Sequence, residues 1–214
     1  MMKRCWPWLV LVGALGVGAW LLLKFVPLPI PVSAGYDPTD APMSYAVSIV
    51  VKDDRPAFSI DPNNAWVIEF GRGSGWQGLN TAKLDQDGHL LLHRLRMERQ
   101  GNPFISGWET TTAELPSGAV AEVLESVKAN RLMELDKAYH AAVCDGTQWV
   151  LWIRQGEREK AVYFDNHFPT PIVRFAERFD AIVSGSVGPA LRWQAVPSAR
   201  VRDHERELWE SIKR

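Results

Sequence analysis

The most apolar stretch of the sequence lies near its start, ahead of every amphipathic pattern. An uncharged run extends from Cys5 to Leu23, between Lys3-Arg4 and Lys24. At about 1.5 Å per helical residue, this run nearly spans a hydrocarbon core of about 30 Å. Residues 1–24 are therefore predicted to form an N-terminal transmembrane anchor, which contacts the lipid bilayer through residues 5–23.

The charges that flank this run predict its orientation. Lys3, Arg4 and the amino terminus outweigh Lys24, so the positive-inside rule places the N-terminus in the cytoplasm. We expect a single-pass inner (cytoplasmic) membrane protein whose C-terminal domain is periplasmic or extracellular. The alternative is a cleaved signal peptide, because Val32-Ser33-Ala34 resembles a cleavage site, although the run exceeds the usual apolar segment of about 7–15 residues. Both alternatives export the rest of the chain.

Composition divides the exported part into three segments. Residues 25–44 are rich in proline and are expected to form an extended linker. Residues 45–196 carry the patterns of a folded α+β domain, and residues 197–214 form a charged, helical C-terminal tail. The apolar residues on one possible helical face of this tail are Val201, Leu208 and Ile212.

Short runs of β-branched and aromatic residues predict the strands of the domain. A glycine loop is expected over Gly71–Gly78, after the second of these runs. Hairpins are predicted at Asp87-Gly88 and Gln155-Gly156, since glycine tolerates the positive φ of a tight turn. The predicted strands are Tyr45–Val51, Ala65–Phe70, Thr81–Leu84 with His89–Met97, Trp149–Ile153 with Ala161–Phe164, and Leu191–Val196.

Apolar residues at i, i+3, i+4 and i+7 predict two amphipathic helices. The first covers Ser117–Ala129, with Ser117 as its N-cap. The second has Thr170 as N-cap and Pro171 at its first position, and it ends at Gly185. Because the strands occur in hairpins, the expected fold class is α+β: an antiparallel sheet with two amphipathic helices on one face, preceded by the N-terminal transmembrane helix.

Charge and cysteine content narrow the range of partners. The chain has 24 Lys+Arg and 25 Asp+Glu, which gives a formal net charge of −1. Residues 1–34 include basic but no acidic residues, so the exported part is more acidic than the whole chain. We expect no nucleic-acid partner, since such proteins present a basic stripe. Cys5 and Cys144 are too few for a disulfide scaffold.

A glycine-rich motif follows the second predicted strand: Gly73-Ser74-Gly75-Trp76-Gln77-Gly78. It matches the G-x-G-x-x-G pattern of dinucleotide-binding loops, but that pattern requires a helix to begin there. A strand and the Asp87-Gly88 turn follow instead, so no cofactor is predicted. An aromatic residue at a loop tip often contacts a partner. The candidate residues for contact with a protein partner are therefore Gly73, Gly75, Trp76 and Gly78.

Two other clusters resemble metal sites without fulfilling their requirements. His89 and His93 share one face of a strand, where they lie about 13 Å apart, too far for one ion. The segment Asp85-Gln86-Asp87-Gly88 lacks the closing glutamate of a calcium loop and is interpreted as a turn. No metal site is predicted.

A thiol site is the remaining candidate for catalysis. Cys144 could combine with His140 or His167 as nucleophile and base. The adjacent Asp145 disfavours the thiolate, because a reactive cysteine needs electropositive surroundings. No catalytic residue is assigned, and the domain is expected not to be an enzyme.

The segment from Trp66 to Val183 contains several short motifs and one helix in an order that is also found in a known protein family. They are Ile68-Glu69-Phe70, Gly73, Gly75-Trp76 and Gly78, a helix at Val120–Val127, then Leu132, Leu135, Asp145–Ile153 and Pro171. In this order the segment distantly resembles the emfourin-type inhibitors of thermolysin-like metalloproteases. The anchor, the long stretch between Arg94 and Leu115 and the tail depart from that pattern, so no inhibitory residue is carried over. An uncharacterised family of membrane-anchored bacterial α+β domains is the alternative.

These observations favour a membrane-tethered extracytoplasmic interaction module without catalytic activity. The resemblance implies an alternative, an inhibitor of an exported metalloprotease. A thiol-dependent enzyme that uses Cys144 is the third possibility.

Overall fold

The computed structural model describes residues 48–74, 78–96, 107–142 and 146–213. The predicted anchor over residues 1–24 and the predicted linker over residues 25–44 lie outside these ranges. None of the helices in the described part of the chain combines the length and the apolar composition that crossing a membrane requires.

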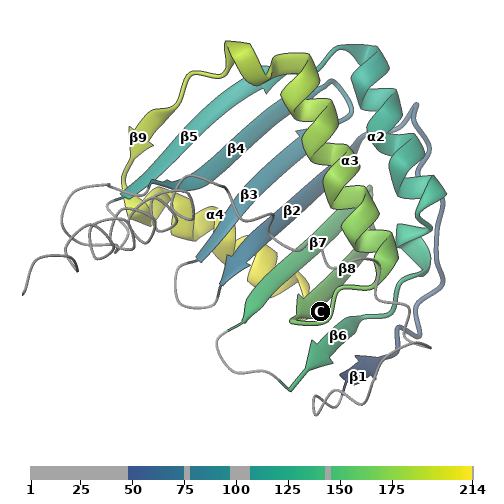
Figure 1. The fold of residues 1–214 in the computed structure, drawn as a ribbon. Coiled ribbons are helices and arrows are strands. Elements are labelled where there is room, and N and C mark those ends of the chain that lie inside the picture. Colours follow the sequence, from purple (N-terminus) through teal and green to yellow (C-terminus); the bar gives the residue numbers. More distant parts are fainter. Residues whose placement is uncertain (1–47, 75–77, 97–106, 143–145, 214) are drawn as a thin grey trace, which may run out of the picture. The chain divides into compact units, whose positions relative to one another are not determined.

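The strands within the described residues form one sheet in the order β1-β6-β8-β7-β2-β3-β4-β5-β9 (Figure 1). In chain order they are β1 (Ser48–Val51), β2 (Trp66–Ser74), β3 (Gly78–Asp85), β4 (His89–Arg96), β5 (Gly107–Glu114), β6 (Ala138–Ala141), β7 (Thr147–Gln155), β8 (Arg158–Asp165) and β9 (Gln194–Val196). Both predicted hairpins are confirmed, as β3–β4 and β7–β8, with Gly88 and Gly156 at φ values of 86° and 59°.

The sheet is mixed, which corrects the prediction of a purely antiparallel one. β6 pairs with β8 in parallel, whereas the other strand pairs are antiparallel. β7 runs opposite to β6, and β8 then turns back to lie between them. The parallel neighbours β6 and β8 therefore need no crossover helix, because β7, which lies between them in the sequence, reverses the chain direction. The α+β fold class itself is confirmed.

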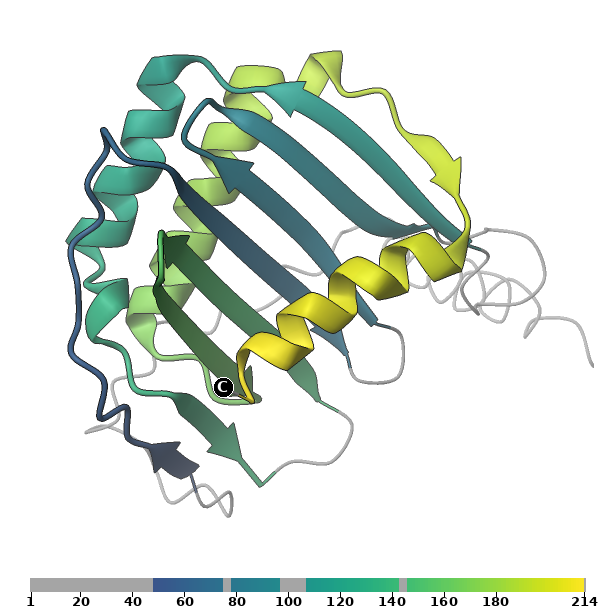
Figure 2. The ribbon, with the colours of Figure 1, turned by 180° about the vertical axis from the view of Figure 1, so that it is seen from behind.

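Three α-helices in the described residues cover the sheet: α2 (Ser117–Ala129), α3 (Thr170–Val187) and α4 (Ser198–Ser211). Figure 1 shows α2 and α3 on one face, which we call the α2–α3 face, and Figure 2 shows α4 crossing the opposite one, the α4 face. The shared face of the two predicted helices is confirmed. A helix was predicted in the C-terminal tail over residues 197–214, and α4 lies there, but its position on the opposite face of the sheet was not predicted.

The predicted helix ends need correction. Ser117 and Thr170 are the first helical residues, while Pro116 and Pro169 occupy the N-cap positions and make no side-chain capping bond. α3 also continues beyond Gly185 to Val187. Val187 is buried in the main core, so its packing extends the helix past Gly185, although glycine often ends a helix.

The two faces bury cores of different sizes. The α2–α3 face holds the main core, where both helices pack on alternate residues of the strands. Its largest fully buried side chains include Trp66, Phe70, Phe164 and Phe175. The α4 face holds a smaller cluster: Leu79, Val150, Trp152, Ala161 and Leu208.

The predicted glycine loop is partly a strand. Gly71 and Gly73 belong to β2, where they pair with β3 and β7. A Cβ atom on Gly71 would lie 2.9 Å from Leu79 Cδ1 and 3.2 Å from Leu208 Cδ1. Glycine in a strand often marks the close approach of another element, and here that element is α4.

Candidate functional site

The α4 face carries a buried cluster of charged residues and an open groove. α4 contacts β2, β3, β5 and β7 and covers part of this face. A buried polar cluster lies beneath the helix, and an open groove lies over other residues of β3, β4 and β5.

Glu69 is the centre of the buried cluster. It lies on β2 with a side chain that is 0% exposed. Its Oε1 accepts a hydrogen bond from Arg154 Nη2 at 2.5 Å and lies 3.3 Å from Lys83 Nζ. Burial of a carboxylate is costly unless it is paired, and these two cations provide that pairing.

α4 adds a histidine and a second carboxylate to this cluster. Nε2 of His204 lies 3.7 Å from Oε2 of Glu69. Ligand atoms of Glu69, His204 and Glu207 all lie within 4.8 Å of one another. Among the described residues, neither Glu69 Oε2 nor His204 Nε2 has a hydrogen-bond partner. The cluster thus holds two buried polar atoms with unused bonding capacity, which native structures seldom tolerate.

Burial governs the charge of the histidine. It lowers the pKa of His204 below the usual value, and the negative charge of Glu69 opposes this shift only in part. The shift favours the neutral form of the imidazole. The ring of His93 on β4 packs beside it, with 5.3 Å between the ring centroids.

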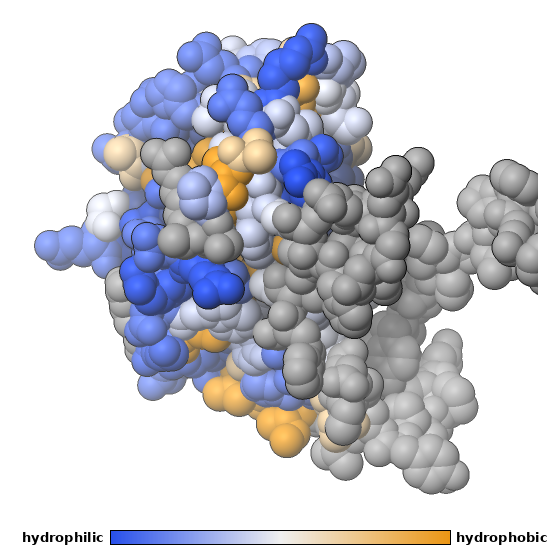
Figure 3. Space-filling model, turned by 90° about the vertical axis from the view of Figure 1, so that its left-hand side faces the viewer, coloured by the Kyte–Doolittle hydropathy of each residue, from blue (hydrophilic) through white to orange (hydrophobic). Residues whose placement is uncertain are grey.

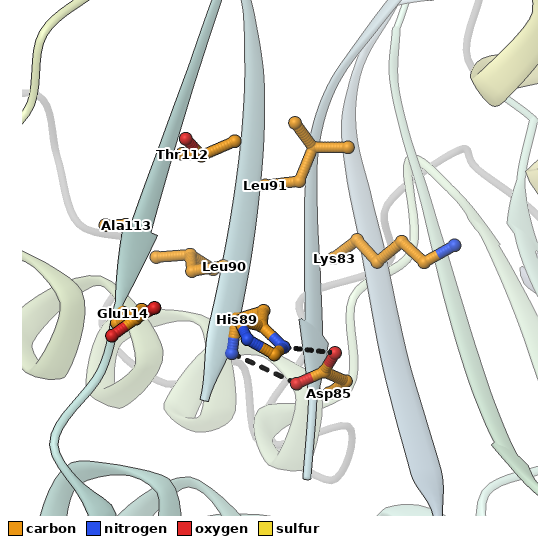
Figure 4. Close-up of a pocket in the computed structure, with 8 residues that line it drawn as sticks. All are labelled: Lys83, Asp85, His89, Leu90, Leu91, Thr112, Ala113 and Glu114. Atoms are coloured by element: carbon orange, nitrogen blue, oxygen red, sulfur yellow. Dashed lines mark hydrogen bonds and ion pairs between the residues drawn. The ribbon is translucent and has the colours of Figure 1, made fainter. Parts of the chain in front are cut away.

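The open groove has a volume of about 460 Å³ and is built on three paired strands (Figure 4). Its lining residues are Lys83, Asp85, His89, Leu90, Leu91, Thr112, Ala113 and Glu114. Lys83 and Asp85 come from β3, His89 to Leu91 from β4, and Thr112 to Glu114 from β5. The groove therefore presents both charges and apolar surface on a rigid support.

Asp85 at the end of the groove maintains the β3–β4 turn. Its Oδ1 accepts hydrogen bonds from the backbone N–H groups of Asp87 and His89, each at 3.0 Å. Its Oδ2 lies 3.0 Å from His89 Nδ1, and this hydrogen bond raises the pKa of His89. Asp85, Asp87 and His89 also bring ligand atoms within 4.8 Å of one another. Because the turn already uses both oxygens of Asp85, the interpretation of this segment as a turn is supported.

The structure places two of the four predicted contact residues. Gly73 lies very close to β3, since a Cβ atom on it would be 2.1 Å from the carbonyl oxygen of Gly78. Gly78 has a φ of 91°, and a Cβ atom there would lie 3.0 Å from Trp108. Both glycines serve close internal packing. Gly75 and Trp76 lie outside the described residues, so contact of this motif with a partner stays a prediction.

The candidate thiol site is described only in part. Cys144 and Asp145 lie outside the described residues. His140 Nδ1 lies 3.7 Å from Asp165 Oδ2, and a backbone hydrogen bond joins His140 to His167. Burial lowers the pKa of His167, and that hydrogen bond opposes the shift. The two histidines are therefore brought together, and their role in thiol chemistry stays a prediction.

Sequence reasoning missed the cluster of Glu69, His204 and Glu207. Two signals could have indicated it. Glu69 stands between two apolar residues of a predicted strand, so its side chain points away from theirs. His204 and Glu207 are three residues apart in a predicted helix, so they share one face. That the helix docks over Glu69 could not be read from these patterns.

Comparison with known proteins does not assign this site. Neither a family model nor a curated protein matches the chain.

Proposed function

We propose that this protein is a membrane-tethered extracytoplasmic interaction module that binds a segment of a protein partner in the groove on the α4 face. The groove of about 460 Å³ carries this proposal. Its side chains stand on three paired strands, so the surface is already organised before a partner binds. Organisation in advance lowers the entropic cost of association.

The chemistry of the groove favours a polar segment with a basic residue. Glu114 lines the groove, and Asp87 lies at the adjoining turn. Leu91 offers apolar contact between them. Among the described residues seen in Figure 3, hydrophilic ones predominate and hydrophobic ones form only small separate areas. A partner that pairs with carboxylates fits such a surface better than a broad apolar one.

Residues 5–23 are proposed to tether the domain to the inner membrane, with the N-terminus in the cytoplasm. The apolar run and its flanking charges support this placement. The full-length protein should stay in the membrane fraction during an alkaline carbonate wash. Protease added to spheroplasts should digest the C-terminal domain, and protection of that domain would refute the orientation.

Site-specific photo-crosslinking in intact cells tests the groove. A photoreactive residue at Thr112, which is exposed in the groove, should crosslink a protein partner. The same residue at Glu125, exposed on α2, is the control and should not. A third position, Trp76, tests the glycine-rich motif. Crosslinks from Trp76 alone would move the contact to that motif, and none from either position would refute an interaction module.

A charge reversal in the groove sharpens this experiment. Glu114→Lys should abolish the crosslink from Thr112, because it opposes a basic partner, whereas Glu125→Lys should leave it intact.

Two further experiments test the alternative functions, a protease inhibitor and a thiol-dependent enzyme. Full-length protein that inhibits a thermolysin-like metalloprotease would favour the inhibitor. A phenotype that Cys144→Ser fails to restore would favour the thiol-dependent enzyme.

A further inference from the structure

The cluster beneath α4 contains ligand atoms that a buried ion pair does not use. Oε1 of Glu69 meets Arg154 and Lys83, but Oε2 faces His204 without a hydrogen bond. We propose that Glu69, His204 and Glu207 bind a divalent transition-metal ion of the zinc class, which fixes α4 to β2. This inference does not depend on the groove or on its partner.

The distances suit a single ion. Two ligand atoms that are each about 2.1 Å from a zinc ion at a tetrahedral angle lie about 3.4 Å apart. Glu69 Oε2 and His204 Nε2 are 3.7 Å apart, and one ligand atom from each of Glu69, His204 and Glu207 lies within 4.8 Å of the other two. Glu207 is exposed on α4, so its side chain can move toward the ion at little cost.

The types of ligand indicate the class of metal. An imidazole nitrogen and two carboxylate oxygens suit zinc and its neighbours, whereas calcium and magnesium take oxygen ligands almost alone. Three protein ligands also leave a coordination position for water. His204 and Glu207 lie three residues apart on one face of α4, and the sheet supplies the third ligand. The ion therefore joins two elements that are remote in sequence.

The cations around Glu69 act as an outer shell. Arg154 and Lys83 bind its other oxygen, and such hydrogen bonds orient a ligating carboxylate. Their two positive charges also repel the ion. We therefore expect affinity in the micromolar range, weaker than that of a structural zinc site built from thiolates.

Calorimetric titration with Zn²⁺ tests the site. Full-length protein is purified in detergent micelles without a polyhistidine tag, and a chelator removes bound metal. We expect one Zn²⁺ per chain, with affinity reduced at least about 100-fold in Glu207→Gln, since even outer-shell changes cost about 10–100-fold. Glu207 is exposed, so this variant should keep the far-ultraviolet circular dichroism of the wild type.

Matched variants locate the ion. Glu210→Gln removes the same charge from an exposed position of the same helix and should bind Zn²⁺ as the wild type does. His89→Gln should also leave binding unchanged, because it alters only the cluster at the β3–β4 turn. Loss of binding in His89→Gln would place the ion at that turn and overturn the proposal, as would wild-type protein that binds no Zn²⁺.

Hydrogen exchange tests the structural effect of the ion. Zn²⁺ should slow exchange of the α4 amides in the wild type and leave them unchanged in Glu207→Gln. Binding without added protection of α4 would refute the role of the ion in fixing the helix.

Discussion

The α2–α3 face and the α4 face belong to one sheet but differ in what they bury. On the first, two helices place continuous apolar stripes over alternate strand residues. On the second, one helix packs over a small apolar cluster and a buried carboxylate, and the groove lies beside it. Apolar burial stabilises without directional requirements, whereas buried polar groups need partners. The α2–α3 face therefore provides most of the stability, and both proposed ligand sites lie on the α4 face.

The largest effect is expected in the main core. Phe175 on α3 is fully buried and packs against Phe70 and Phe179. Phe175→Ala should reduce the free energy of unfolding by about 4 kcal/mol, because it leaves a cavity between helix and sheet. Urea denaturation, monitored by circular dichroism, measures the free energy of unfolding. A loss no greater than that for Leu208→Ala on the other face would contradict the comparison.

A buried ion pair at the rim of the main core should give the next largest effect. Lys160 Nζ binds Asp53 Oδ2 at 2.7 Å and also donates to the carbonyl oxygen of Leu135. Asp53→Asn should cost about 3 kcal/mol of unfolding free energy, since the ammonium group loses its charged partner.

The same pair makes stability depend on pH. Burial opposes the charge of Asp53, but hydrogen bonds from Arg55 and Lys160 together outweigh it and hold the pKa well below its usual range. The unfolded chain binds the proton more readily, so this contribution is complete above a pH of about 4 and is lost as the pH falls further. Acid titration of stability should be flatter in Asp53→Asn, and an equal slope would refute the assignment.

A smaller and more local effect is expected beneath α4. Leu208 is fully buried against Gly71 and Leu79. Leu208→Ala should cost about 2 kcal/mol and should chiefly release α4. Hydrogen exchange should accelerate in α4 while α2 and α3 remain protected. Uniform acceleration in all three helices would show that the two faces unfold as one unit.

The smallest effect tests the close approach of α4 to the sheet. Gly71→Ala places a methyl group against Leu79 and Leu208 and should cost about 1 kcal/mol. Gly185→Ala in α3 is the matched control, because its Cβ atom would meet nothing within 4 Å. The control should be neutral or stabilising, since alanine favours a helix. Equal effects in thermal melting would argue against tight packing at Gly71.

Elements that depend on neighbouring residues could be predicted from the sequence. The β3–β4 and β7–β8 hairpins followed from Gly88 and Gly156, and α2 followed from its apolar period, although its N-cap is Pro116 and not Ser117. β5 and β6 were missed. Threonine at Thr110–Thr112 of β5 gives little apolar alternation, and β6 has only four residues, so tertiary pairing alone defines both.

The candidate site was less predictable than the fold. The glycine-rich motif was predicted to contact a partner because of its pattern, but Gly73 and Gly78 allow close packing within the domain. Glu69, His204 and Glu207 formed no motif, because a strand and a distant helix contribute them. Local patterns report which face a side chain occupies, not which element will cover it.

Periodicity and turn residues within a few positions were enough to predict the α+β class, two hairpins and the apolar stripes of α2 and α3. The parallel pairing of β6 with β8, and the position of α4 on the face opposite α2 and α3, became apparent only from the folded domain. Those outcomes depend on which surfaces remain to be buried once the sheet has formed. Glu69 and His204 lie close together because α4 covers the part of the sheet that contains Glu69.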